Sequence, residues 1–121
     1  MEPKRLGAIE SRFAEIVWAH APLTSPELVR LCAAELGWKK STTYTVLRRL
    51  CDAGLFENDR GTVRVRMSRR AYDSAQSTRF VDEAFSGSLP AFLAAFTDGK
   101  KLTPREVDEL QRLIDRYREE G

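Results

Sequence analysis

One change of hydrophobic period, close to Gly54, constrains the fold of this chain more than any other feature. Before it, apolar residues recur at helical spacing in three segments; after it, residues 63–67 (Val-Arg-Val-Arg-Met) alternate between apolar and basic. Alternation indicates a half-buried strand, because successive side chains point to opposite faces. We predict two short strands, 55–58 and 63–67, joined by a turn at 59–62. Three helices followed by such a hairpin is the order of a winged helix-turn-helix.

Start and stop signals bound the three predicted helices. The first covers residues 6–20. The second begins at Thr24, which can form a capping box with Glu27, and it stops at Gly37, a residue that readily adopts the left-handed conformation. The third covers residues 40–53. The sequence therefore predicts a mainly α-helical fold.

The third predicted helix carries two faces of different chemistry. One face should enter the core, and its residues are Thr43, Val46, Leu47 and Leu50. The other face carries hydroxyl, methyl and guanidinium groups, which are the groups that read base edges in the major groove of DNA. A bidentate arginine–guanine pair contributes about 1–3 kcal/mol of discrimination. The candidate base-reading residues are Thr42, Thr45, Arg48 and Arg49.

The net charge of +2 hides an asymmetry between the two halves of the chain. Residues 1–72 carry 13 Lys/Arg against 8 Asp/Glu, whereas residues 73–121 carry 7 against 10. A basic half joined to an acidic half indicates a polyanionic partner for the first half. Phosphate contacts supply most non-specific affinity for DNA. The candidate DNA-backbone residues are Lys39, Lys40, Ser41, Tyr44, Arg60, Arg64 and Arg66. The alternative is that these residues only form a solvated face.

The remaining part of the chain reads as a second, helical domain. We predict helices over about 72–86, over 90–97 and from Pro104, with Thr103 and Glu106 capping the last one. These helices are too few to enclose their apolar side chains, and such exposed patches mark interfaces. We therefore expect a symmetric homodimer. The candidate dimer-interface residues are Phe80, Phe85, Leu89, Phe92, Phe96, Leu110, Leu113 and Tyr117. The alternative is a tail folded back on the first domain.

The predicted domains are residues 1–71, for DNA binding, and 72–121, for dimerisation.

Several other classes of protein and site are disfavoured. No run of 18 apolar residues indicates a membrane span, and residues 1–7 lack the features of a signal peptide, so we expect a cytoplasmic protein without membrane insertion. Cys32 and Cys51 form no paired motif and should be small buried hydrophobes rather than redox or metal-binding groups. The only histidine, His20, lies at a helix end. We expect no catalytic residues, no metal site and no cofactor.

Three stretches together resemble the penicillinase repressor family, which includes the methicillin-resistance regulators. They are Leu-Gly-Ala-Ile-Glu through Ile-Val-Trp at 6–18, Trp through Ser-Thr-Thr-Tyr-Thr-Val-Leu-Arg-Arg-Leu to Gly-Leu at 38–55, and Phe-Ser-Gly-Ser-Leu at 85–89 with Phe96. The resemblance spans nearly the whole chain. It implies a homodimer with an N-terminal winged helix and a three-helix C-terminal dimerisation region, which sits on a palindromic operator and blocks transcription, often of antibiotic-resistance or metal-homeostasis genes.

The resemblance also carries residue roles and departures from the family pattern. The family's base-reading threonines match Thr42 and Thr45 and its arginine matches Arg49, whereas a lysine common before the first threonine is replaced by Ser41. The best-known members are released from DNA by cleavage of an Asn-Phe bond, triggered by a membrane sensor protease. The matching pair is Ala95-Phe96, so the phenylalanine is kept and the asparagine is not. The cysteine cluster of copper-responsive relatives is absent.

The sequence leaves one function of another class in play. Winged helices also serve as protein–protein interaction adaptors that do not bind DNA sequence-specifically. The basic hairpin and the threonine–arginine face of the third helix favour DNA binding over this alternative.

Overall fold

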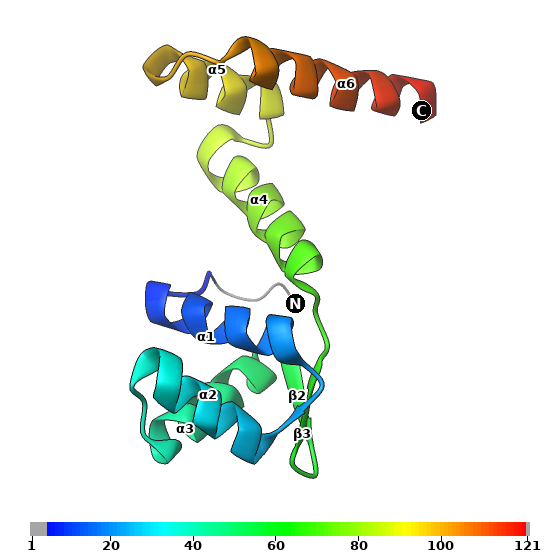
Figure 1. Ribbon diagram of the computed structural model, residues 1–121. Helices are drawn as coiled ribbons and strands as arrows, with labels where there is room; N and C mark the ends of the chain where they lie inside the picture. The colour runs from blue at the N-terminus through cyan, green and yellow to red at the C-terminus, as the bar shows by residue number, and fades with distance from the viewer. Residues whose placement is uncertain (1–4, 121) are drawn as a thin grey trace. The chain divides into compact units, whose positions relative to one another are not determined.

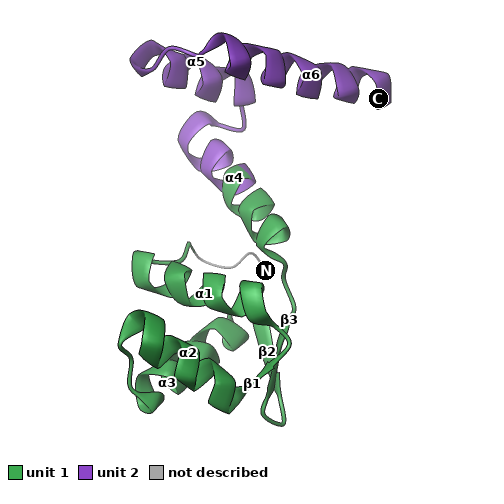
Figure 2. Cartoon of the chain, viewed as in Figure 1, with its two compact units in different colours: residues 1–77 green, residues 78–121 purple. Residues whose placement is uncertain are grey.

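The computed structural model describes residues 5–120, and it divides into two compact units with a boundary between residues 77 and 78. Residues 1–4 and 121, the outer ends of the two predicted domains, lie outside the described residues. The boundary falls within one helix, α4 (Arg69–Phe85), which changes colour along its length in Figure 2. The first turns of α4 therefore belong to the first unit.

The first unit is a three-helix bundle with a small antiparallel sheet, so the predicted winged helix-turn-helix is confirmed (Figure 1). The sheet has the strand order β1-β3-β2, and β2 and β3 form the hairpin, or wing. The elements are α1 (Ala8–His20), β1 (Leu23–Thr24), α2 (Ser25–Leu36), α3 (Lys40–Asp52), β2 (Phe56–Asp59) and β3 (Thr62–Val65).

The wing differs in detail from its prediction. Its connection is a two-residue turn, Arg60-Gly61, with φ of +53° and +90°, and positive φ at both positions is what a type I′ hairpin turn requires. Asn58 closes the turn, because its Oδ1 accepts a hydrogen bond from the backbone N–H of Gly61 at 3.0 Å. The strand β1 was not predicted. It has two residues and is recognisable only through its pairing with Thr62 and Val63 of β3.

A continuous apolar core joins the three helices to the sheet. Its largest fully buried side chains include Phe13 of α1, Leu28 of α2, Leu47 of α3 and Phe56 of β2. Ile9 is apolar but is 62% exposed. The helix begins at residue 8 rather than 6, which places Ile9 in its first turn, one turn before the buried part of the helix.

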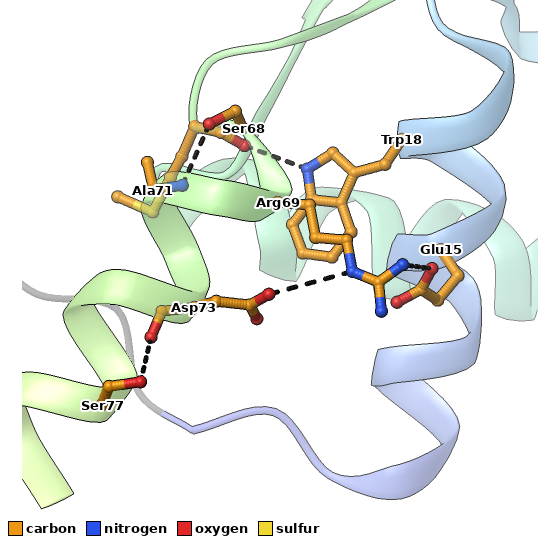
Figure 3. Close-up of polar contacts among 8 residues, drawn as sticks. Glu15, Trp18, Ser68, Arg69, Ala71, Asp73 and Ser77 are labelled. Atoms are coloured by element: carbon orange, nitrogen blue, oxygen red, sulfur yellow. Dashed lines mark hydrogen bonds and ion pairs between the residues drawn. The ribbon is translucent and has the colours of Figure 1, made fainter. Parts of the chain in front are cut away.

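Polar contacts (Figure 3) and one aromatic contact fix the start of α4 to the first unit. The indole Nε1 of Trp18 donates a hydrogen bond to the carbonyl oxygen of Met67 at 3.0 Å. A guanidinium nitrogen of Arg69 lies 2.8 Å from a carboxylate oxygen of Glu15. The Tyr72 hydroxyl accepts a hydrogen bond from the backbone N–H of Leu6 at 2.9 Å, and the Tyr72 ring contacts Trp18. These contacts tie the beginning of α4 to the first unit.

Helix α4 begins three residues earlier than predicted. The Ser68 hydroxyl accepts a hydrogen bond from the backbone N–H of Ala71 at 3.0 Å, which is the geometry of a helix N-cap. Serine before a helical segment is a recognisable start signal, although the sequence prediction starts this helix at about residue 72. The correction adds Arg69, Arg70 and Ala71 to the helix.

The second unit consists of the rest of α4, helix α5 (Leu89–Gly99) and helix α6 (Pro104–Glu120). Ser86 and Gly87, with φ of +51° and +81°, end α4. The predicted cap of α6 is confirmed: Thr103 Oγ1 accepts from the N–H of Glu106 at 3.1 Å, and Glu106 Oε1 accepts from the N–H of Thr103 at 2.9 Å. Helix α5 extends beyond its predicted range of 90–97 at both ends. Within residues 5–120, every helix is too short or too polar to cross a membrane.

Candidate nucleic-acid interface

Helix α3 divides into a buried and an exposed face as its periodicity predicts. Thr43, Val46, Leu47 and Leu50 are buried in the core. The four candidate base-reading residues, Thr42, Thr45, Arg48 and Arg49, are all exposed. The helix therefore offers its hydroxyl, methyl and guanidinium groups outward while its apolar side holds it on the bundle.

Two threonines of α3 bond back to the helix backbone. The Thr43 hydroxyl donates to the carbonyl oxygen of Lys39 at 3.2 Å, which satisfies a polar group inside the core. The exposed Thr45 hydroxyl donates to the carbonyl oxygen of Ser41 at 2.9 Å. Because the Thr45 proton is engaged, this side chain can offer a partner its methyl group and the acceptor lone pairs of its oxygen.

Arg49 is held by an acidic residue of another helix. Its Nη1 lies 3.4 Å from Oε2 of Glu10 in α1, and the two side chains are 61% and 26% exposed. Sequence reasoning missed Glu10. The two positions are 39 residues apart, so only the packing of α1 beside α3 brings them together.

The candidate DNA-backbone residues lie on α3 and the wing. Six of them are exposed: Lys39, Lys40, Ser41, Arg60, Arg64 and Arg66. Tyr44 is half-buried, with the Lys40 Nζ 6.0 Å from its ring centroid, at the outer limit of a cation–π contact. Arg64 lies opposite Glu57 in the β2–β3 register, and Asp59 ends β2, so two acidic residues share the wing with the arginines.

The wing is anchored by Ser25, a second residue that sequence reasoning missed. Its backbone N–H and its hydroxyl both donate to the carbonyl oxygen of Gly61, at 2.8 and 3.1 Å. Ser25 is buried at the start of α2, so the turn of the wing is fixed to the helical bundle. Its only sequence signal was its place next to the capping residue Thr24.

The other candidate reactive groups lie outside this face or are shielded. Cys32 is buried and Cys51 is half-buried, and burial raises the pKa of both thiols. A raised pKa keeps a thiol protonated and unreactive at neutral pH. His20 is exposed in the last turn of α1. Among residues 5–120, no group of three or more His, Cys, Asp or Glu side chains could hold a metal ion.

The second unit has a small aromatic cluster and an apolar surface. Phe80, Phe85, Phe92 and Phe96 have ring centroids 5.6–6.2 Å apart in successive contacts. Of the candidate interface residues, five are exposed: Phe80, Leu89, Phe96, Leu113 and Tyr117. The other three, Phe85, Phe92 and Leu110, are half-buried. The exposed fractions of Phe80 (51%) and Tyr117 (72%) are large for aromatic residues.

Comparison with known proteins identifies a matching protein family. A family model described as penicillinase repressor matches residues 6–116, a range that takes in the exposed face of α3, the wing and most of the second unit. A search of curated proteins found no match.

Proposed function

The chain belongs to the penicillinase repressor family of DNA-binding transcriptional repressors, and we propose that it binds a palindromic operator as a homodimer. In this proposal, α3 of each protomer enters a major groove and the wing follows the DNA backbone. The role is regulatory rather than enzymatic. Because the protein acts on DNA, we expect it to be in the cytoplasm.

The single observation that carries the proposal is the outward face of α3. A major groove is wide enough to admit a helix, and the groups on its outer face then reach base edges. Thr42, Thr45 and Arg49 provide these groups from an exposed helix whose other side is buried. Thr45, with its proton engaged by Ser41, suits a thymine methyl or an exocyclic amino group of a base.

The basic residues around α3 supply affinity and register. Arg60, Arg64 and Arg66 of the wing and its turn are exposed, and Lys39 and Lys40 flank the start of α3. Cations at such positions contact phosphates of any sequence, so they raise affinity for every duplex and fix the orientation of the helix. Anchoring of the turn by Ser25 limits the freedom of the wing before it binds.

The second unit supports the homodimer. Its exposed apolar side chains form a surface of the kind that monomeric proteins cover, and pairing of two copies is the commonest way to cover it. We assign DNA binding to residues 1–71 and dimerisation to residues 72–121. Two copies of α3 then read two half-sites about one helical turn apart.

The family resemblance also implies a further partner, a membrane sensor protease. The matching bond, Ala95–Phe96, lies inside α5, where the Thr97 hydroxyl also bonds the carbonyl oxygens of Leu93 and Ala94. Local opening of the helix must precede cleavage of such a bond. We propose that any proteolytic release at this position requires α5 to unwind.

The proposal is tested by selection from a library of random duplexes, followed by titration of the selected duplex and a scrambled one. Arg49→Ala should lower the ratio of selected to scrambled affinity by about 5- to 150-fold, the size of one bidentate contact. Arg64→Ala should weaken both duplexes similarly and reduce the salt slope by about 1. Arg118→Ala, which removes the same charge at the end of α6, is the control and should change neither quantity.

Two outcomes would contradict the proposal. If the wild-type chain enriches no sequence, it does not read DNA and the adaptor function is favoured. If sedimentation shows only monomers at micromolar concentration, the protein has no twofold symmetry that a palindromic operator could match.

A further inference from the structure

We propose that Glu10 is a positioning residue for base recognition, which orients the guanidinium of Arg49 and withholds it from non-specific phosphate binding. The inference rests on the proposed function and deepens it. It assigns selectivity for one base pair to an interaction between α1 and the recognition helix, outside the face that touches DNA.

The first step is the geometry of the pair. Arg49 Nη1 lies 3.4 Å from Glu10 Oε2. A guanidinium has five N–H donors in one plane, so a contact through Nη1 leaves Nε and the second terminal nitrogen for the two acceptors of guanine. The distance exceeds the roughly 2.7–2.9 Å of a tight charge-assisted bond. The guanidinium can therefore adjust to a base edge without losing the carboxylate.

The second step is the confinement of the carboxylate. The Glu10 side chain is only 26% exposed. It lines a shallow depression between α1 and α3, together with Gly7, Ile9, Trp38, Thr42, Val46 and Arg49 itself. A long arginine side chain loses much rotamer freedom when it is fixed on a base. A confined anion that already restricts Arg49 lowers this loss, which is the general effect of preorganisation on affinity and specificity.

The third step is charge. The wing arginines Arg60, Arg64 and Arg66 form no ion pair with any residue in the range 5–120, whereas Arg49 is paired. The Arg49–Glu10 pair has no net charge, and its carboxylate repels a phosphate that approaches Arg49. Base acceptors are neutral and are not repelled in this way. Glu10 therefore directs Arg49 toward bases, while the wing arginines serve the phosphates.

The test is the variant Glu10→Gln, titrated against the duplex selected by the wild-type chain and a scrambled duplex of equal length and composition. Affinity for the scrambled duplex should rise, because a negative charge near DNA is removed. The ratio of selected to scrambled affinity should fall by about fivefold, a part of the discrimination that one bidentate contact provides. The exposed Glu35 of α2 offers a matched control: Glu35→Gln removes the same charge and should leave the ratio unchanged.

Two further variants separate positioning from charge and from folding. Glu10→Asp keeps the charge but shortens the side chain, so the ratio should fall without a gain on the scrambled duplex. In an Arg49→Ala background, Glu10→Gln should no longer change the ratio. The inference is overturned if Glu10→Gln keeps the wild-type ratio, or if it lowers the ratio equally with and without Arg49. Failure of the proposed function is distinct, since the wild-type chain would then select no duplex.

Discussion

Replacement of Trp18 by phenylalanine should destabilise the first unit more than the same replacement of Trp38. Trp18 is half-buried, and its ring contacts Phe56 and Tyr72 at centroid distances of 5.7 Å. Its indole N–H donates to Met67 O. Trp38 stacks on the ring of Phe13 in the core, and its indole nitrogen makes no hydrogen bond to any residue between 5 and 120. The pair of variants therefore isolates one hydrogen bond on a common background of lost ring area.

The magnitude follows from the contacts that phenylalanine can and cannot replace. Its ring can keep most of the contact with Phe56 and Tyr72, so the loss of the second indole ring costs about 1 kcal/mol at either tryptophan. Loss of the N–H bond at Trp18 leaves the partly buried Met67 carbonyl without its donor and costs about 1 kcal/mol more. We expect a total near 2 kcal/mol for Trp18→Phe, which is about 8–16 °C in Tm for a unit of this size.

Urea unfolding followed by far-UV circular dichroism measures both variants. All chains should be compared at one protomer concentration, because association shifts apparent stability. An unchanged slope with a lower midpoint shows that native stability has fallen. Equal destabilisation by Trp18→Phe and Trp38→Phe would show that the bond to the Met67 carbonyl does not hold α4 on α1, and the reasoning would be refuted.

Three further predictions concern local features. Gly37→Ala should cost about 1–2 kcal/mol in urea unfolding, because residue 37 has φ +68° and an added Cβ meets no atom within 4 Å, so only backbone strain is introduced. Hydrogen bonds from the backbone and side chain of Thr103 lower the pKa of Glu106, so its ionised form stabilises α6. This stabilisation is present above the usual pKa of 4.5 and is lost as pH falls through the lowered value; the difference in helicity between wild type and Glu106→Gln should vanish there. Burial raises the pKa of Cys32 and Cys51, so iodoacetamide should modify both slowly at pH 7.5, and by mass spectrometry Cys51, which is less buried, should react first.

Local signals accounted for most of the fold. The capping boxes at Thr24 and Thr103 and the left-handed Gly37 are determined by neighbouring residues, and each is where the sequence indicates. Strand β1 could not be predicted in the same way, because two residues show no period and the strand exists only through its partner β3. The early start of α4 had a local signal in Ser68, a serine that caps the helix before its predicted first residue.

In the candidate site too, features set by local sequence could be predicted, whereas features set by long-range packing could not. Exposure of Thr42, Thr45 and Arg49 follows from helical period alone, because a residue on the face opposite a core stripe must face outward. The ion pair of Arg49 with Glu10 and the anchoring of the wing turn by Ser25 depend on how separate elements pack. No period or motif encodes such long-range contacts, so the residues that position a site are harder to predict than the residues that form it.

The distribution of ion pairs bears on how the proposed repressor separates affinity from selectivity. The second unit contains two ion pairs between residues of the same helix: Arg79–Glu83 lies in α4 and Arg105–Glu109 lies in α6. Residues 73–121 are acidic overall. We therefore expect DNA to repel residues 73–121 and to attract the first unit, whose wing arginines form no ion pair within residues 5–120. Because long-range attraction depends on unpaired charge, we expect the wing to guide any duplex to the protein. In the proposed mechanism Arg49, which forms an ion pair with Glu10, contributes little to that attraction and acts only at contact, where a matching base can be distinguished from a mismatched one.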